Sequence, residues 1–139
     1  MQARESTLVA RPADTVFAFI SDPAHDHLWR SHLVSSRGSS SAIGDHITQS
    51  YEYEGHRKSV ELEVTERQPP ERLTYSIRAP ISVRMSFQCR PEGGGTRVSF
   101  SMSANLSGPA ALFESRAQSE LEKLIKSDLG RLRDVLEGL

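Results

Sequence analysis

The chain has 139 residues, of which 37% are hydrophobic and 25% are charged, and its formal net charge at pH 7 is −1. This balance argues against a nucleic-acid-binding protein, which usually carries a strong basic excess, and against electrostatic capture by acidic membranes. The length fits one domain over residues 1–139. We predict a cytoplasmic protein without membrane insertion, because the sequence has a single cysteine, no apolar signal core and no long apolar run.

Residues 5–10 are predicted to form a short first strand, which two short helices follow. Pro12 suits the first turn of the first helix, where a missing N–H costs nothing. The apolar face of this helix consists of Val16, Phe17, Phe19 and Ile20. Asp22 and Pro23 are typical of the N-cap and the first residue of a second helix. That brief helix carries His25, His27, Leu28 and Trp29. The Ser/Gly-rich stretch 35–44 predicts a loop or a frayed strand.

Between residues 46 and 102 the hydrophobic period changes to two, which is typical of strands with one face in water. Five runs alternate in this way, and their apolar phases are Ile47, Gln49, Tyr51 and Tyr53; Val60, Leu62 and Val64; Leu73, Tyr75 and Ile77; Val83, Met85, Phe87 and Cys89; and Val98, Phe100 and Met102. Gly55, Pro69-Pro70 and the glycines at 93–95 mark turns between them. Five successive runs joined by short turns predict an antiparallel meander.

The segment 110–137 contains no proline and predicts a long C-terminal helix, preceded by Ser107-Gly108-Pro109. Its apolar side chains recur at spacings of three and four; they are Leu112, Phe113, Leu121, Leu124, Ile125, Leu129, Leu132, Val135 and Leu136. A helix of about 40 Å needs a large apolar surface, which only the sheet offers. Because a twisted sheet curls and one helix cannot fill its concave side, the predicted fold is α+β with an apolar pocket between sheet and helix.

Several segments occur in a characteristic order: VARPADTVFAFISDP after the first strand, Trp29, the loop ending in Gly44-Asp45, ERQPPERLTYSI, and GGGTRVSFSM before the last helix. In their order and spacing they make the chain resemble the SRPBCC superfamily, also called START-like or Bet v 1-like. Within it, the chain is similar to the bacterial polyketide cyclase/dehydrase and lipid-transport family. The resemblance implies the helix-grip fold, with a curved antiparallel sheet of six to seven strands around the C-terminal helix. It also implies binding of lipids, sterols, polyketides or plant metabolites, and some members are cyclases or aromatases.

Eight side chains are candidates for ligand binding in the pocket: Trp29, Gln49, Tyr51, Tyr53, Tyr75, Met85, Phe87 and Phe100. On the apolar phase, the tyrosines would offer hydroxyls that need a partner from the ligand or the protein; as the alternative, they are strand aromatics that fill the core. Gln49 in the same phase indicates a hydrogen bond to a ligand or an ordered water. Trp29 would either stack on a flat ligand or pack the short helices onto the sheet.

The densest polar cluster comprises His25, Asp26, His27 and His32. His25 and His27 are two residues apart and would lie on different faces of a helix, so a solvated surface near the pocket mouth is favoured over a metal site. A proton-shuttling histidine is the other alternative. No metal, cofactor or catalytic residue is predicted from these spacings.

Three functions are compatible with these observations. The favoured one is binding of an apolar small molecule, of the lipid, polyketide or aromatic metabolite class, by a monomer or homodimer. The second is a polyketide cyclase, aromatase or dehydratase, which requires an acid/base group with a shifted pKa inside the pocket. The third is an interaction module like the activators of the Hsp90 ATPase, which share the PPERL-type turn; it predicts an exposed apolar patch of several hundred Å².

Overall fold

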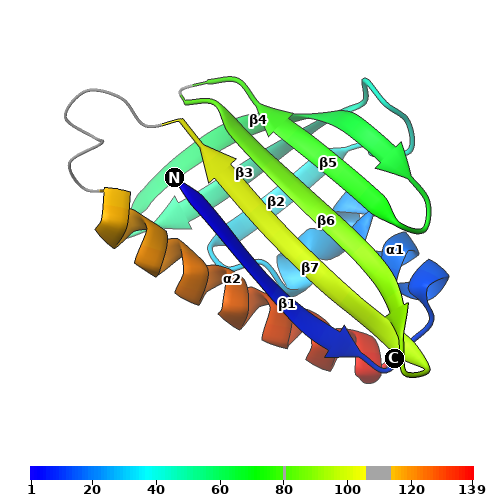
Figure 1. The fold of residues 1–139 in the computed structure, drawn as a ribbon. Helices are drawn as coiled ribbons and strands as arrows, with labels where there is room; N and C mark the ends of the chain where they lie inside the picture. Colours follow the sequence, from blue (N-terminus) through cyan, green and yellow to red (C-terminus); the bar gives the residue numbers. More distant parts are fainter. Residues whose placement is uncertain (80, 106–113) are drawn as a thin grey trace.

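The computed structural model describes residues 1–79, 81–105 and 114–139 (Figure 1). Within them, seven strands form one antiparallel sheet in the order β1-β7-β6-β5-β4-β3-β2. The strands are β1 (Gln2–Val9), β2 (Leu33–Gly38), β3 (His46–Tyr53), β4 (His56–Gln68), β5 (Arg72–Ile77), β6 (Val83–Glu92) and β7 (Gly95–Ala104). Strands β2 to β7 pair in chain order, which confirms the predicted meander, and β1 is added at its far edge beside β7.

The two short helices follow β1, as the sequence predicts. α1 (Ala13–Ile20) begins one residue after Pro12, which takes the N-cap position instead of the first helical turn. The second, η1 (Pro23–Leu28), is a 3₁₀ helix, and the Asp22 side chain accepts a hydrogen bond from the Ala24 backbone N–H at 3.0 Å. The stretch 35–44 begins as the edge strand β2 and continues as a turn.

The C-terminal helix, α2 (Glu114–Glu137), crosses the concave side of the curled sheet along β1 (Figure 1). At 24 residues it is about 36 Å long. Its buried apolar side chains are Ile125, Leu129, Leu132 and Leu136. The predicted residues 107–113, including Leu112 and Phe113, lie outside the described part of the chain.

The period-two pattern matches the burial of the strands. Side chains of the predicted apolar phase, such as Ile47, Leu62 and Val98, are at most 1% exposed. They face the helix side of the sheet, and register pairs such as Phe87 with Phe100 bring them together across neighbouring strands. Among the described residues, no helix is long and apolar enough to cross a membrane.

Candidate functional site

An apolar cavity of about 530 Å³ lies between the sheet and α2. Its sheet wall contains Val60, Ile77, Val83, Met85, Phe100 and Met102. Its helix wall contains Ala117, Leu121, Leu124 and Ile125. This volume lies within the range of about 300–1,000 Å³ that is typical of small-molecule sites. Mainly apolar walls are also typical of such sites.

The polar residues of the cavity differ in exposure, which gives it an outer and an inner end. His32 and Tyr53 are exposed, and their rings meet edge-on at a centroid distance of 4.9 Å. His32 has a φ of 65°, the left-handed region, where a residue other than glycine is uncommon. Arg30 and Asp128 are buried, at 9% and 3% exposure, and mark the inner end. Tyr51, half-buried, lies in the same wall.

A chain of hydrogen bonds connects the inner end of the cavity to the buried carboxylate of Asp26. Nη2 of Arg30 donates to the Tyr51 hydroxyl at 3.2 Å, and that hydroxyl donates to Oε1 of Gln49 at 2.5 Å. Nε2 of Gln49 then donates to Oδ2 of Asp26 at 3.0 Å. The Ser36 hydroxyl donates to the same Asp26 oxygen at 3.3 Å and accepts from Gln49 at 3.3 Å. Tyr51, Gln49 and Asp26 therefore each have a protein partner along this path.

Asp26 is unusual because it is an aspartate that is only 6% exposed. Burial raises the pKa of Asp26 from 3.8 to about 7, although the nearby Arg30 charge and the hydrogen bonds from Ser36 and Gln49 oppose the shift. The geometry of η1 explains why an aspartate in a polar segment is turned inward. In a 3₁₀ helix every third residue shares a face, and Pro23, Asp26 and Trp29 are all buried. The predicted solvated surface is therefore wrong for Asp26.

The second buried carboxylate, Asp128, comes from α2. Its Oδ1 accepts hydrogen bonds from the Ser31 backbone N–H at 3.1 Å and from the Ser31 hydroxyl at 2.5 Å. Its Oδ2 lies 3.7 Å from Nε of Arg30, and its Oδ1 lies 3.7 Å from Nη1 of Arg131. One carboxylate thus faces two guanidinium groups and ties the segment after η1 to the C-terminal helix.

The structure divides the eight predicted ligand-binding residues into two groups. Four line the cavity, namely Tyr51, Tyr53, Met85 and Phe100. The other four are buried but are not part of its wall, namely Trp29, Gln49, Tyr75 and Phe87. Gln49 is 1% exposed and faces inward as predicted, with Asp26, Ser36 and Tyr51 as its partners. A role in ligand binding stays a prediction for all eight.

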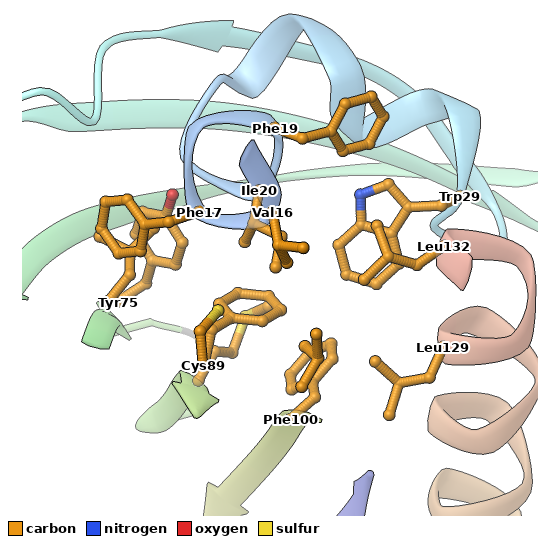
Figure 2. Close-up of a cluster of buried hydrophobic side chains, with 14 of the residues drawn as sticks. Val16, Phe17, Phe19, Ile20, Trp29, Tyr75, Cys89, Phe100, Leu129 and Leu132 are labelled. Atoms are coloured by element: carbon orange, nitrogen blue, oxygen red, sulfur yellow. The ribbon is translucent and has the colours of Figure 1, made fainter. Parts of the chain in front are cut away.

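Trp29 packs in the closed core beside the cavity (Figure 2). Its side chain is fully buried, and its ring meets Phe87 and Phe100 edge-on at centroid distances of 5.8 and 6.1 Å. Residues of α1 and α2, including Leu132, surround it in Figure 2. Of the two alternatives for Trp29, packing of the short helices onto the sheet fits this position. Burial also raises the pKa of the Tyr75 hydroxyl, which stays neutral.

The histidines lie apart from one another. His25 stacks on Phe19 at 4.3 Å and its Nδ1 is 3.1 Å from the Phe19 carbonyl, whereas His27 is exposed. Only His32 of this predicted cluster lines the cavity. In the described part of the chain, no three His, Cys, Asp or Glu side chains gather as a metal site would require.

Comparison with known proteins identifies the chain's relatives. The family model for polyketide cyclase/dehydrase and lipid transport matches residues 1–137, whereas no curated protein matches the chain. Protein NE0264 from Nitrosomonas europaea has 15% sequence identity and a TM-score of 0.81, over 99% of this chain and 95% of that one. DR_A0006 from Deinococcus radiodurans has 20% identity and a TM-score of 0.76, over the full length of both chains.

A third similar structure is the di-domain ARO/CYC BexL from the BE-7585A biosynthetic pathway. It has 15% identity and a TM-score of 0.77, over 96% of this chain and 49% of that one. At such identities the likeness to all three structures concerns the fold. It confirms the α+β arrangement of a curled antiparallel sheet around a C-terminal helix.

Proposed function

This chain belongs to the polyketide cyclase/dehydrase and lipid transport family, and we propose that it binds an apolar small molecule in the cavity between the sheet and α2. The ligand would be of the lipid, polyketide or aromatic metabolite class. The observation that carries this proposal is the cavity itself, about 530 Å³ in volume and walled mainly by apolar side chains.

The exposure of the cavity walls supports the proposal energetically. Val60, Val83, Met102, Leu121 and Leu124 line the cavity and are only partly buried. A ligand that covered them would remove apolar surface from water, which is worth about 25 cal/mol for each Å². The core around Trp29 and Leu132 is already closed (Figure 2), so the fold does not depend on a ligand to bury its centre.

The test combines ligand discovery with a blocked cavity. Native mass spectrometry of the full chain, purified from its own host, should show a bound mass. Titration with the neutral dye Nile red should show enhanced fluorescence in the wild type. Ala117→Trp places an indole in the helix wall and should weaken dye binding by about tenfold or more. Ala18→Trp is the matched control, because Ala18 is exposed on α1, and it should bind like the wild type.

Equal dye binding by both variants would refute the cavity as the binding site. The proposed function as a whole would be refuted if the protein purifies without a bound ligand and binds none of Nile red, sterols, fatty acids and aromatic polyketides.

A second candidate, a cyclase, aromatase or dehydratase acting in the same cavity, is favoured by the buried chain from Asp26 to Arg30. In an aldol cyclisation a base removes a proton from the carbon beside one carbonyl, and the resulting enolate forms a C–C bond at a second carbonyl, whose oxygen takes up a proton. The new hydroxyl then leaves as water with a proton from the adjacent carbon, and a C=C bond forms. Arg30, which lines the cavity, would stabilise the enolate oxygen. Asp26, whose pKa burial raises to about 7, is connected to the cavity through Gln49 and Tyr51, and Tyr51 is the member of this chain that lines the cavity together with Arg30.

The test for this second candidate uses a synthetic poly-β-ketone. Incubation with the wild type should give a product that has lost one water, and Arg30→Met should abolish the acceleration while the protein still binds Nile red. A product that forms at the same rate without protein would refute the enzyme.

The interaction module like the Hsp90 activators would use the outer surface instead. In the described part of the chain, the exposed large apolar side chains come from separate segments, among them Leu8, Val34, Ile43 and Ile81. Among these described residues, no specific contact favours this function over the two in the cavity.

A further inference from the structure

The inner end of the cavity is bounded by a guanidinium group with more donors than partners. Arg30 lines the cavity at 9% exposure. To the described residues it makes one hydrogen bond, from Nη2 to the Tyr51 hydroxyl. Its Nε is enclosed without a hydrogen-bond partner among those residues. Since a guanidinium carries five N–H donors in a planar fork, most of its hydrogen-bonding capacity is not used by them.

This guanidinium is held in place by the protein. Its central carbon lies 5.5, 6.0 and 5.3 Å from the ring centroids of Trp29, Tyr51 and Phe100, distances at which a cation is attracted to an aromatic face. The Tyr51 proton is committed to Gln49, so the Tyr51 oxygen is the acceptor toward Arg30. A ligand would therefore meet a donor group whose position is already fixed.

The carboxylates around Arg30 do not fully compensate its positive charge, so a further anion would be attracted to it. The nearest ion-pair partner, Asp128, lies 3.7 Å from its Nε, which is too long for a hydrogen bond. Asp128 is also shared with Arg131 and takes two hydrogen bonds from Ser31. Burial raises the pKa of Asp26 to about 7, so this carboxyl is largely neutral below that pH. Two guanidinium groups then face one full negative charge.

From this geometry we infer that the ligand carries an anionic oxygen terminus, a carboxylate or an enolate, which lies against Arg30 while its apolar body fills the rest of the cavity. The inference rests on the proposed function and specifies its ligand class. Hydrogen bonds to an ionised acceptor are roughly twice as strong as those between neutral groups. An alcohol offers a single uncharged oxygen, and a hydrocarbon would leave the guanidinium donors without an acceptor.

The experiment compares ligands that differ only at one end. Dodecanoate, methyl dodecanoate and 1-dodecanol compete with Nile red for the full-length protein at pH 6, where Asp26, whose pKa burial raises to about 7, is largely neutral. We expect dodecanoate to bind about 10- to 100-fold more tightly than dodecanol, the range for a hydrogen bond to a charged group. The comparison is stringent, because dodecanol is the more hydrophobic molecule and would win if shape and apolar burial alone decided affinity. Equal or weaker binding of dodecanoate would overturn the inference.

A substitution then assigns the preference to Arg30. Arg30→Met keeps the bulk of the stem and should reduce dodecanoate binding to the level of dodecanol, whose affinity should stay near the wild-type value. Arg57→Met removes an exposed arginine paired with Glu52 and should leave both affinities unchanged. If Arg30→Met does not fold, Arg30→Lys keeps the charge without the planar fork and should give an intermediate preference. A preference for dodecanoate that stays at the wild-type level in Arg30→Met, or in Arg30→Lys where Arg30→Met does not fold, would contradict the role of Arg30.

The two proposals fail in different ways. If none of the three ligands displaces Nile red and no mass co-purifies, the binding function itself is wrong. If dodecanol displaces the dye and dodecanoate has no advantage, binding stands and only the anionic terminus is wrong.

Discussion

Replacement of Asp26 by asparagine should change how the stability of this protein depends on pH. Asp26 is 6% exposed, and burial raises the pKa of its carboxyl group from 3.8 to about 7. In the unfolded chain the same group would return to its ordinary pKa. Between these two values the folded state binds the proton and the unfolded state does not, so protonation of Asp26 stabilises the fold at low pH. This contribution is lost as the pH rises toward 7.

The size of the effect follows from the shift. A shift from 3.8 to about 7 corresponds to about 4 kcal/mol between the extremes, at 1.36 kcal/mol per pKa unit. Between pH 5 and pH 8 the Asp26 contribution to the free energy of unfolding should fall by about 2–3 kcal/mol. Asparagine has nearly the same shape and its Oδ1 still accepts from Gln49, but it does not titrate. On going from pH 5 to pH 8, the free energy of unfolding of Asp26→Asn should therefore rise by about 2–3 kcal/mol relative to that of the wild type.

Urea denaturation at pH 5 and pH 8, followed by circular dichroism, measures this double difference. Other titrating groups contribute equally to both proteins and cancel. Asp134→Asn is the control, because Asp134 is an exposed aspartate on α2, and its difference from the wild type should be nearly the same at both pH values. If Asp26→Asn also shows a constant difference, the Arg30 charge and the two hydrogen bonds hold Asp26 ionised in the fold, and the argument from burial is refuted.

Two further predictions concern stability alone. Asp128→Ala leaves the buried Arg30 charge without its carboxylate and should lower the free energy of unfolding by about 3–5 kcal/mol. The control Arg57→Ala breaks an exposed pair with Glu52 and should cost at most about 1 kcal/mol in the same urea experiment. Similar losses in the two variants would contradict a stabilising role of the buried pair. Leu132→Ala removes a fully buried side chain of α2 and should cost about 2–5 kcal/mol, while Leu28→Ala, at a 43% exposed leucine, should cost less than about 1 kcal/mol. Equal losses would mean that α2 does not pack as described.

The strand alternation predicted the inner wall of the sheet well, because a side-chain period of two leaves only two choices of face. Gln49 and Tyr75 face inward as their phase requires, and both are buried. Tyr53 has the same phase but is 58% exposed, because it pairs with His56 beside the turn at the end of the sheet. Phase therefore predicts the direction of a side chain, whereas its burial depends on what lies above that end of the strand.

The polar inner end was much harder to predict. Arg30 follows a 3₁₀ helix in a segment without periodicity, so no pattern indicated its direction. The inward direction of Asp26 is not predictable for a related reason, because a period of three over only six residues is too short to recognise. Asp128 did leave a signal, since it falls on the apolar stripe of α2 between Ile125 and Leu132. A carboxylate at a core position requires a partner, and the pairing with Arg30 is a tertiary contact over nearly a hundred residues.

The distribution of unsatisfied donors is the strongest link between this fold and a ligand. Among the described residues two buried side-chain nitrogens lack a hydrogen-bond partner, Nε1 of Trp29 and Nε of Arg30. Such a group costs about 1–3 kcal/mol. Trp29 lies in the closed core (Figure 2), so the free-energy cost of its unsatisfied Nε1 is the same with and without a ligand in the cavity. Arg30 borders the cavity, and although its Nε is enclosed, an acceptor in the cavity would engage the other N–H groups of the same guanidinium. Affinity gained there would come from hydrogen bonds that the described residues do not supply, in addition to the apolar surface that any ligand of suitable size would cover.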